Sequence, residues 1–171
     1  NPDGSVFVDP IICAPEARRQ LQRRLLMLYT GLTRCADDIL SEQSRKSASD
    51  EEKQAGLRRM VGLAEQMQGA LNRNELDGFG EVLHMNWMEK RRLASGISNP
   101  TIDYWYETAR AHGAIGGKIL GAGGGGFLLL YAPTERHEEI CGALPELRPI
   151  AFQFEPQGSK LIFIEENGYA P

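Results

Sequence analysis

Apolar side chains recur along this chain with two different spacings, which divide it into helical and strand-like segments. Between about residues 50 and 90 they fall three or four positions apart, the spacing that places them on one face of an α-helix. Around 25–29, 114–132 and 150–154 they form short continuous runs instead, which is typical of buried strands. The pattern therefore predicts a chain that mixes helices with a sheet.

Capping residues give the expected helix starts. Thr33, Ser49 and Asn74 are the expected N-caps of three successive helices, and Asn99 followed by Pro100 starts a fourth. The polar tract Ser41–Ser49 is the one segment expected to be a disordered linker. The predicted elements are a strand at 5–8, a helix at 15–24, a strand at 25–29, the three helices, a helix from 99 to about 112, strands at 114–119 and 127–132, a helix from 133 covering Ile140 and Leu144, and strands at 150–154 and 161–164.

The order of these elements indicates a fold. From Leu25 to Phe154 it reads strand, helices, strand, strand, helix, strand, the split β-α-β-β-α-β order of a ferredoxin-like sandwich. We therefore expect an α+β domain over residues 1–171, with extra helices inserted in the first crossover and helices covering one face of a mainly antiparallel sheet. Residues 1–24 form the strand and short helix that lead into the domain.

Composition narrows the class of protein. The 171 residues are 42% hydrophobic and 25% charged, with a formal net charge of −4, which argues against a general nucleic-acid binder. The sequence contains no run of about eighteen apolar residues, so it predicts no membrane-spanning helix. The three cysteines form no C-x-x-C motif and the three histidines are scattered, so we expect free thiols, a cytoplasmic location and no metal site.

Seven of the nineteen glycines fall between Gly116 and Gly126. Glycine inside an element costs about 0.5–1 kcal/mol relative to alanine, so such a run is expected where the backbone needs positive φ or a close approach. Backbone N–H groups that hold a phosphate need both. The predicted topology places this loop at the tip of the central hairpin, with its backbone exposed.

Three common phosphate motifs fit the loop poorly. Gly121–Gly126 satisfies G-x-G-x-x-G, but a strand follows where a dinucleotide-binding fold needs a helix. Lys118 precedes the glycines, whereas a Walker A loop has its lysine at the end. The companion motifs of protein kinases are missing.

The segment from Lys118 to Phe127 resembles the third conserved motif of the GHMP sugar and mevalonate kinase superfamily. The segment Leu28–Asp37, with its Tyr-Thr-Gly and its arginine, resembles the D-glycero-D-manno-heptose 7-phosphate kinase branch. The resemblance covers the C-terminal half of such enzymes and implies the ferredoxin-like fold. The ATP loop and the aspartate that deprotonates the sugar hydroxyl belong to the N-terminal half of the family, and neither motif occurs in this sequence.

The resemblance implies a function for the full-length protein, which is transfer of the ATP γ-phosphate to the anomeric hydroxyl of D-glycero-D-manno-heptose 7-phosphate. ATP and Mg²⁺ are the implied cofactors, with metal ligands and catalytic base in the missing N-terminal domain, and this chain alone is expected to be inactive and to self-associate. Two alternatives stay open. One is another GHMP kinase acting on fucose, galactose or mevalonate, and the other is a ferredoxin-like binding module without catalysis.

The expected site has two groups of residues, each with a structural alternative. Backbone amides of the glycine loop are expected to face phosphate or the loop that holds it, and the structural alternatives are a flexible hairpin tip or a tight backbone crossing. The Lys118 ammonium is expected to offset phosphate charge, or else to be a surface lysine on an edge strand. Thr30, Gly31 and Arg34 lie where a strand meets a helix, and Arg34 can grip a substrate phosphate or pair with Asp37 or Asp38. The phosphate-binding set is Lys118, Gly121, Gly123, Gly124, Gly125 and Gly126.

Overall fold

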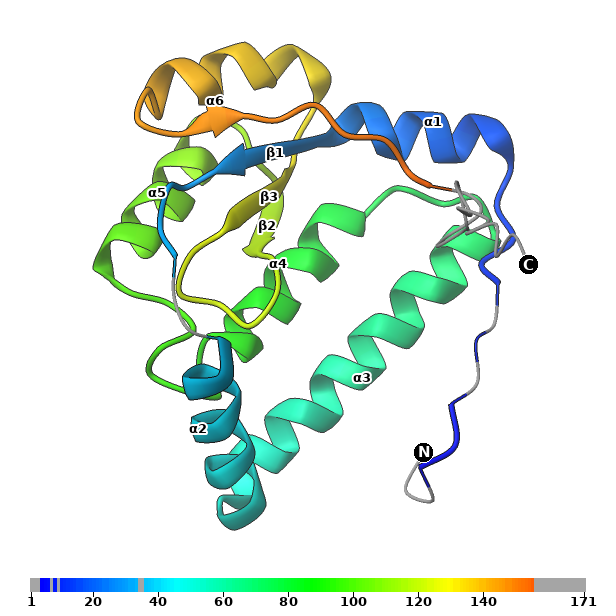
Figure 1. Ribbon diagram of the computed structural model, residues 1–171. Helices are drawn as coiled ribbons and strands as arrows, with labels where there is room; N and C mark the ends of the chain where they lie inside the picture. Colours follow the sequence, from blue (N-terminus) through cyan, green and yellow to red (C-terminus); the bar gives the residue numbers. More distant parts are fainter. Residues whose placement is uncertain (1–3, 7, 9, 34–35, 156–171) are drawn as a thin grey trace, which may run out of the picture.

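The computed structural model describes residues 4–6, 8, 10–33 and 36–155, and Figure 1 shows their arrangement. The elements in chain order are α1 (Pro15–Arg24), β1 (Leu25–Tyr29), α2 (Ala36–Ser49), α3 (Glu51–Asn72), α4 (Phe79–Lys90), α5 (Pro100–Ala111), β2 (Gly116–Ile119), β3 (Phe127–Tyr131), the 3-10 turn η1 (Thr134–Arg136), α6 (His137–Ala143) and β4 (Arg148–Pro149).

The four strands form one antiparallel sheet in the order β2-β3-β1-β4. β1 pairs with β3 along its whole length, from Leu25 opposite Tyr131 to Tyr29 opposite Phe127. This order is the one expected for the β-α-β-β-α-β arrangement, with α2, α3 and α4 inserted before α5 in the first crossover. The predicted ferredoxin-like fold is confirmed.

The core lies between one face of the sheet and helices α5 and α6 (Figure 1). Leu28, Leu128 and Leu130 alternate with outward-facing residues along β1 and β3 and have no exposed surface. They meet Tyr106 of α5 and Ile140 of α6, which are equally buried. At about 25 cal/mol per Å² of apolar surface removed from water, these side chains supply the main stabilisation of the domain.

Helix α4 approaches the edge strand β2 so closely that two glycines are required. A Cβ atom at Gly116 would lie 1.9 Å from the carbonyl oxygen of Gly80, and a Cβ at Gly80 would lie 2.7 Å from side-chain atoms of Ile115 and Tyr131. Gly116 therefore serves helix packing rather than the hairpin tip. The approach brings the C-terminal end of α4 beside the glycine loop.

The predicted capping holds at α5 and differs at two other helices. Asn99 accepts hydrogen bonds from the amides of Thr101 and Ile102, as the Asn-Pro pair predicted. The polar tract expected as a linker is helical as part of α2, so Ser49 lies inside a helix and Asp50 caps α3 in its place. Asp50 is the single residue between α2 and α3 and accepts from two amides of the first turn of α3.

The expected cap at Asn74 is also wrong. Asn74 has φ 61° and its side-chain oxygen accepts from the Ala14 amide, which ties the chain before α1 to the end of α3. Helix α4 starts later, at Phe79, after Gly78 with φ 80°. The expected apolar stripe of α3 is half-buried at most, and Val61 is 58% exposed.

The strands expected at the two ends of the domain differ most. No strand forms at Ser5, Val6 and Val8, where the two valines are more than 80% exposed and no neighbouring strand is present in the described chain. Near the other end, β4 pairs with β1 at 148–149, and the predicted strand 150–154 is not formed. The strand predicted at 161–164 lies outside the described residues.

The register explains why β4 stops early. Antiparallel pairing with β1 would place residues beyond 152 opposite α1, because the helix occupies the chain immediately before Leu25. A helix offers no strand edge. The Gln22 side chain of α1 instead donates to the Phe152 carbonyl at 3.0 Å and accepts from the Phe154 amide at 2.9 Å.

Replacing Gly116 with alanine is expected to destabilise the protein by about 2–3 kcal/mol or more, because the added methyl group overlaps the α4 backbone. Gly62→Ala is the matched control, since a Cβ there meets nothing within 4 Å and alanine is up to about 1 kcal/mol better than glycine in a helix. The thermal unfolding midpoint should fall for Gly116→Ala and hold or rise for Gly62→Ala. Equal midpoints for the two variants would contradict the close approach of α4 to β2.

Candidate functional site

The glycine loop joins β2 to β3 and is the tip of the central hairpin, as predicted. Its glycines at 121, 123, 124, 125 and 126 all have positive φ, between 73° and 158°. L-residues rarely adopt these angles, so the loop conformation itself requires glycine at these positions.

The loop is also a tight backbone crossing. The Gly124 amide donates to the Ile97 carbonyl at 2.9 Å, and the Gly126 amide donates to the Leu32 carbonyl at 2.8 Å. A Cβ at Gly123 would lie 2.7 Å from the Ile97 Cα, and one at Gly125 would lie 2.5 Å from the Leu32 carbonyl oxygen. The loop is therefore clamped between the segment after β1 and the segment before α5.

Because the loop is clamped, the amides that were expected to face phosphate fall into two groups, with and without a hydrogen-bond partner in the described chain. Those of Gly124 and Gly126 are used inside the chain, and Gly124 and Gly125 are buried. The amides of Gly121, Ala122 and Gly123 have no hydrogen-bond partner in the described part of the chain, and Gly121 is exposed. The open donors thus lie at the β2 end of the loop rather than across its whole length.

Thr30 fixes the other end of the loop. It is 6% exposed, its hydroxyl donates to the Gly126 carbonyl at 2.9 Å, and its amide donates to the same oxygen at 3.0 Å. The Thr30 oxygen also accepts from the Leu32 amide at 3.3 Å. Gly31 is exposed with φ 70°, and Arg34 lies outside the described residues.

Lys118 lies on the sheet face opposite the core, where it pairs in register with Leu129. Its side chain is half-buried, and burial lowers the pKa of its ammonium group below the ordinary value. No carboxylate or hydrogen-bond partner contacts it within the described chain. An unpaired, partly desolvated cation of this kind is suited to binding an anion.

Lys90, which is not among the residues expected from the sequence to bind phosphate, lies close enough to Lys118 for the two charges to interact. It is the last residue of α4, is half-buried, and donates from Nζ to the Gly121 carbonyl. Burial, together with the charge of Lys118, lowers the pKa of the Lys90 ammonium to about 8. A signal was present in the sequence, because Lys90 continues the stripe of Leu83 and Trp87 at helical spacing.

Aromatic side chains and an arginine lie further along the same sheet face. The Tyr29 and Phe127 rings contact each other, with centroids 5.3 Å apart, and the Arg148 guanidinium lies 5.5 Å from the Tyr29 ring centroid. Neither Tyr29 nor Phe127 is fully buried. This side of the sheet therefore presents apolar surface next to the two lysines.

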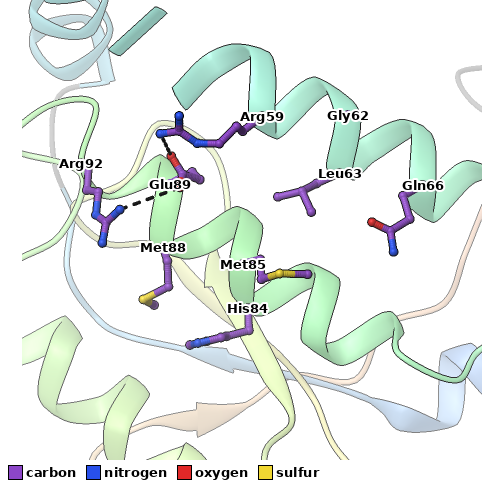
Figure 2. A pocket seen from close by; sticks show the side chains of 9 residues that line it. All are labelled: Arg59, Gly62, Leu63, Gln66, His84, Met85, Met88, Glu89 and Arg92. Carbon is purple, nitrogen blue, oxygen red and sulfur yellow. Dashed lines mark hydrogen bonds and ion pairs between the residues drawn. The ribbon is translucent and has the colours of Figure 1, made fainter. Parts of the chain in front are cut away.

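A separate cavity of about 490 Å³ lies between α3 and α4 (Figure 2). Met85, Met88 and Leu63 supply its apolar wall, while Arg59 and Arg92 both pair with Glu89, at 2.7 Å and 3.8 Å. None of the glycine-loop residues lines this cavity.

His84 links that cavity to the core. Its Nδ1 lies 2.7 Å from the Tyr106 hydroxyl, and burial is the main cause that lowers the pKa of the imidazole. Burial raises the pKa of Tyr106 to about 12. The pair is therefore a neutral hydrogen-bonded contact between α4 and α5.

Among the described residues, no three His, Cys, Asp or Glu side chains are placed to bind a metal ion together. Within the same residues, no helix is both long enough and apolar enough to cross a bilayer.

Residues 67–148 match the family model described as GHMP kinases C terminal. The matched segment runs from the later turns of α3 through the glycine loop to the start of β4. It therefore contains the hairpin, both lysines and the helices of the core.

Two curated proteins are similar to the chain in sequence. The bifunctional fucokinase/GDP-fucose pyrophosphorylase of Arabidopsis thaliana is 30% identical over 141 residues, covering 81% of this chain and 13% of that protein. The D-glycero-alpha-D-manno-heptose 7-phosphate kinase of Campylobacter jejuni is 28% identical over 157 residues, covering 91% of this chain and 46% of that protein. The chain thus spans less than half the length of either relative.

Solved structures support the fold. The mevalonate kinase of L. major, in complex with R-mevalonate, superposes with a TM-score of 0.62 at 20% identity, over 73% of this chain and 40% of that one. Family match, strand order and glycine hairpin agree. Residues 67–148 of the chain are therefore a GHMP kinase C-terminal domain.

Proposed function

We propose that this chain is the C-terminal part of an ATP-dependent sugar kinase. In the full-length protein, the proposed reaction transfers the γ-phosphate to the anomeric hydroxyl of D-glycero-D-manno-heptose 7-phosphate. The observation that carries the proposal is the set of unpartnered amides at Gly121–Gly123 beside the Lys118 ammonium. Such a group of fixed donors and a positive charge favours the binding of phosphate oxygens.

The residues of this chain would act by positioning and by charge. The open amides hold phosphate oxygens at fixed points, and Lys118 offsets their negative charge. Thr30 keeps the loop in place through the Gly126 carbonyl, so the donors need no rearrangement when substrate binds. Mg²⁺, when bound, would neutralise further phosphate charge, with ligands and catalytic base supplied by the N-terminal domain that we propose as partner.

The choice of acceptor rests on similarity and on one segment. The Campylobacter jejuni relative, a heptose 7-phosphate kinase by name, aligns with 91% of this chain. We propose that Gly31 and Arg34, which follow β1, help to hold the phosphate that this acceptor already carries.

A fucose-type acceptor is the second candidate. It is favoured by the 30% identity to the Arabidopsis thaliana protein, which is a fucokinase by name. Fucose carries no phosphate, so the two candidates differ in whether the enzyme needs a second anion site.

A comparison of acceptors in the full-length protein tests the proposed reaction. Heptose 7-phosphate should give a kcat/KM at least about 100-fold above those of fucose, galactose and mevalonate, because a site with paired polar groups rejects an acceptor that leaves them empty. The measurement is a coupled ADP-release assay at equal ATP. Fucose as the best acceptor would replace heptose by the second candidate, and no turnover with any of the four would contradict the sugar kinase.

Removing the Thr30 hydroxyl tests whether the anchored loop matters for turnover. Thr30→Val should lower kcat/KM about tenfold and destabilise the protein by about 1–2 kcal/mol, because the Gly126 carbonyl and the Leu32 amide lose a buried partner. Thr30→Ser, which keeps the hydroxyl, is the matched control and should stay near wild type. Wild-type kinetics in Thr30→Val would show that the anchor is not needed for catalysis.

A further inference from the structure

Two of the described lysines have no acid beside them, and these two are neighbours. Lys46 pairs with Glu42 and Lys53 pairs with Asp50, both on helices. Lys90 and Lys118 have no carboxylate within the described chain, although both are half-buried. The contrast indicates that the described part of the chain supplies no counterion to this pair.

The placement of the pair is unfavourable unless an anion completes it. Each ammonium loses part of its hydration through burial, and the two positive charges repel each other. Neither element is free to move away, because α4 is held against β2 by the glycine contact at Gly80 and Gly116. The fold therefore holds two cations together at a cost in stability.

The surroundings indicate the chemistry of the missing anion. Lys90 donates to the carbonyl of Gly121, whose own amide is the first of the open donors of the loop. Two ammonium groups and several N–H groups without a partner in the described chain thus belong to adjoining parts of α4, β2 and the loop. Two positive charges match a phosphate dianion better than a carboxylate, which carries a single charge.

We propose that Lys90 and Lys118, with the amides of Gly121–Gly123, form a cradle for one phosphate dianion carried by a substrate. This inference rests on the proposed kinase function only for the source of the phosphate, which is either the nucleotide or the phosphorylated acceptor. Lys90 is the new member of the site. Its ammonium lies between the loop carbonyl and the anion and so couples the loop to the bound phosphate.

Binding of sulfate and inorganic phosphate to the full-length protein tests the cradle without any turnover. Lys90→Met and Lys118→Met should each weaken the affinity for both ions about tenfold or more, measured by isothermal titration calorimetry at constant ionic strength, because each loses a charge-assisted hydrogen bond. Lys46→Met is the matched control and should bind as wild type does. Equal affinity in all four proteins, or an equal loss in the control, would overturn the proposal.

The pH dependence of sulfate affinity provides a second test, because a lysine with only a structural role would not affect it. Sulfate stays a dianion throughout, so its affinity should fall above about pH 8 as Lys90 loses its proton in the free protein. Among the charged groups near α4, the Lys118 ammonium of β2 lowers the pKa of Lys90. Arg59 of α3 pairs with Glu89, and Asp103 of α5 pairs with Arg91.

Lys90→Arg separates this effect from general loss of charge. Arginine stays protonated, so this variant should bind sulfate at pH 7 and lose less affinity between pH 8 and pH 9.5 than wild type does. An unchanged profile in Lys90→Arg would assign the titration to another group and overturn the role of Lys90. Because Lys90 makes no ion pair with any described residue, Lys90→Met should not lower the thermal midpoint of the ligand-free protein.

Kinetics then identify the source of the phosphate. A rise in KM for heptose 7-phosphate alone in Lys90→Met assigns the cradle to the acceptor, and a rise in KM for ATP with every acceptor assigns it to the nucleotide. If sulfate binding depends on the two lysines but no sugar is phosphorylated, the cradle is confirmed and the proposed function is wrong. If Lys90→Met phosphorylates the sugar as wild type does and its sulfate affinity is unchanged, the proposed function stands and the cradle is wrong.

Discussion

The backbone crossing of the glycine loop is the constraint on which the rest of this domain depends. Two amides of the loop donate to the carbonyls of Leu32 and Ile97, which belong to segments far apart in the sequence. No side chain fits at Gly123 or Gly125 without touching those backbones, and the φ angles exclude ordinary L-residues as well. One short run of glycines thus joins the end of β1, the start of α5 and the central hairpin.

This crossing also decides what the loop can bind. The amides of Gly124 and Gly126 clamp the loop and Gly125 is buried, so the accessible amides without a partner in the described chain are those of residues 121–123. At that end the approach of α4 to β2 brings two unpaired ammonium groups together. Packing and charge are therefore linked, because the glycine at 116 that lets α4 come close also places Lys90 beside the loop.

The sequence predicted the parts of the fold in which local chemistry and tertiary packing agree. The sheet order, the bounds of α1 and β1, and the Asn99 cap all follow from spacing and capping residues. Predictions failed where a neighbouring element decides whether a strand forms. β4 stops where α1 replaces a strand edge, and Ser5, Val6 and Val8 have no neighbouring strand in the described part of the chain. The glycine hairpin was predictable, but the division of its amides was not, because it depends on contacts with Leu32 and Ile97. For Lys90, the sequence predicted only a charged residue that continues the buried stripe of α4.

Above all, we propose that the β2 end of the loop and the two lysines bind a substrate phosphate. A crystal structure of the full-length protein with a non-hydrolysable ATP analogue and a sugar phosphate tests it most directly. We expect a phosphate oxygen within about 3 Å of the Lys90 or Lys118 Nζ and of at least one amide of Gly121–Gly123. Phosphates bound elsewhere, with both ammonium groups and these amides facing solvent, would contradict it.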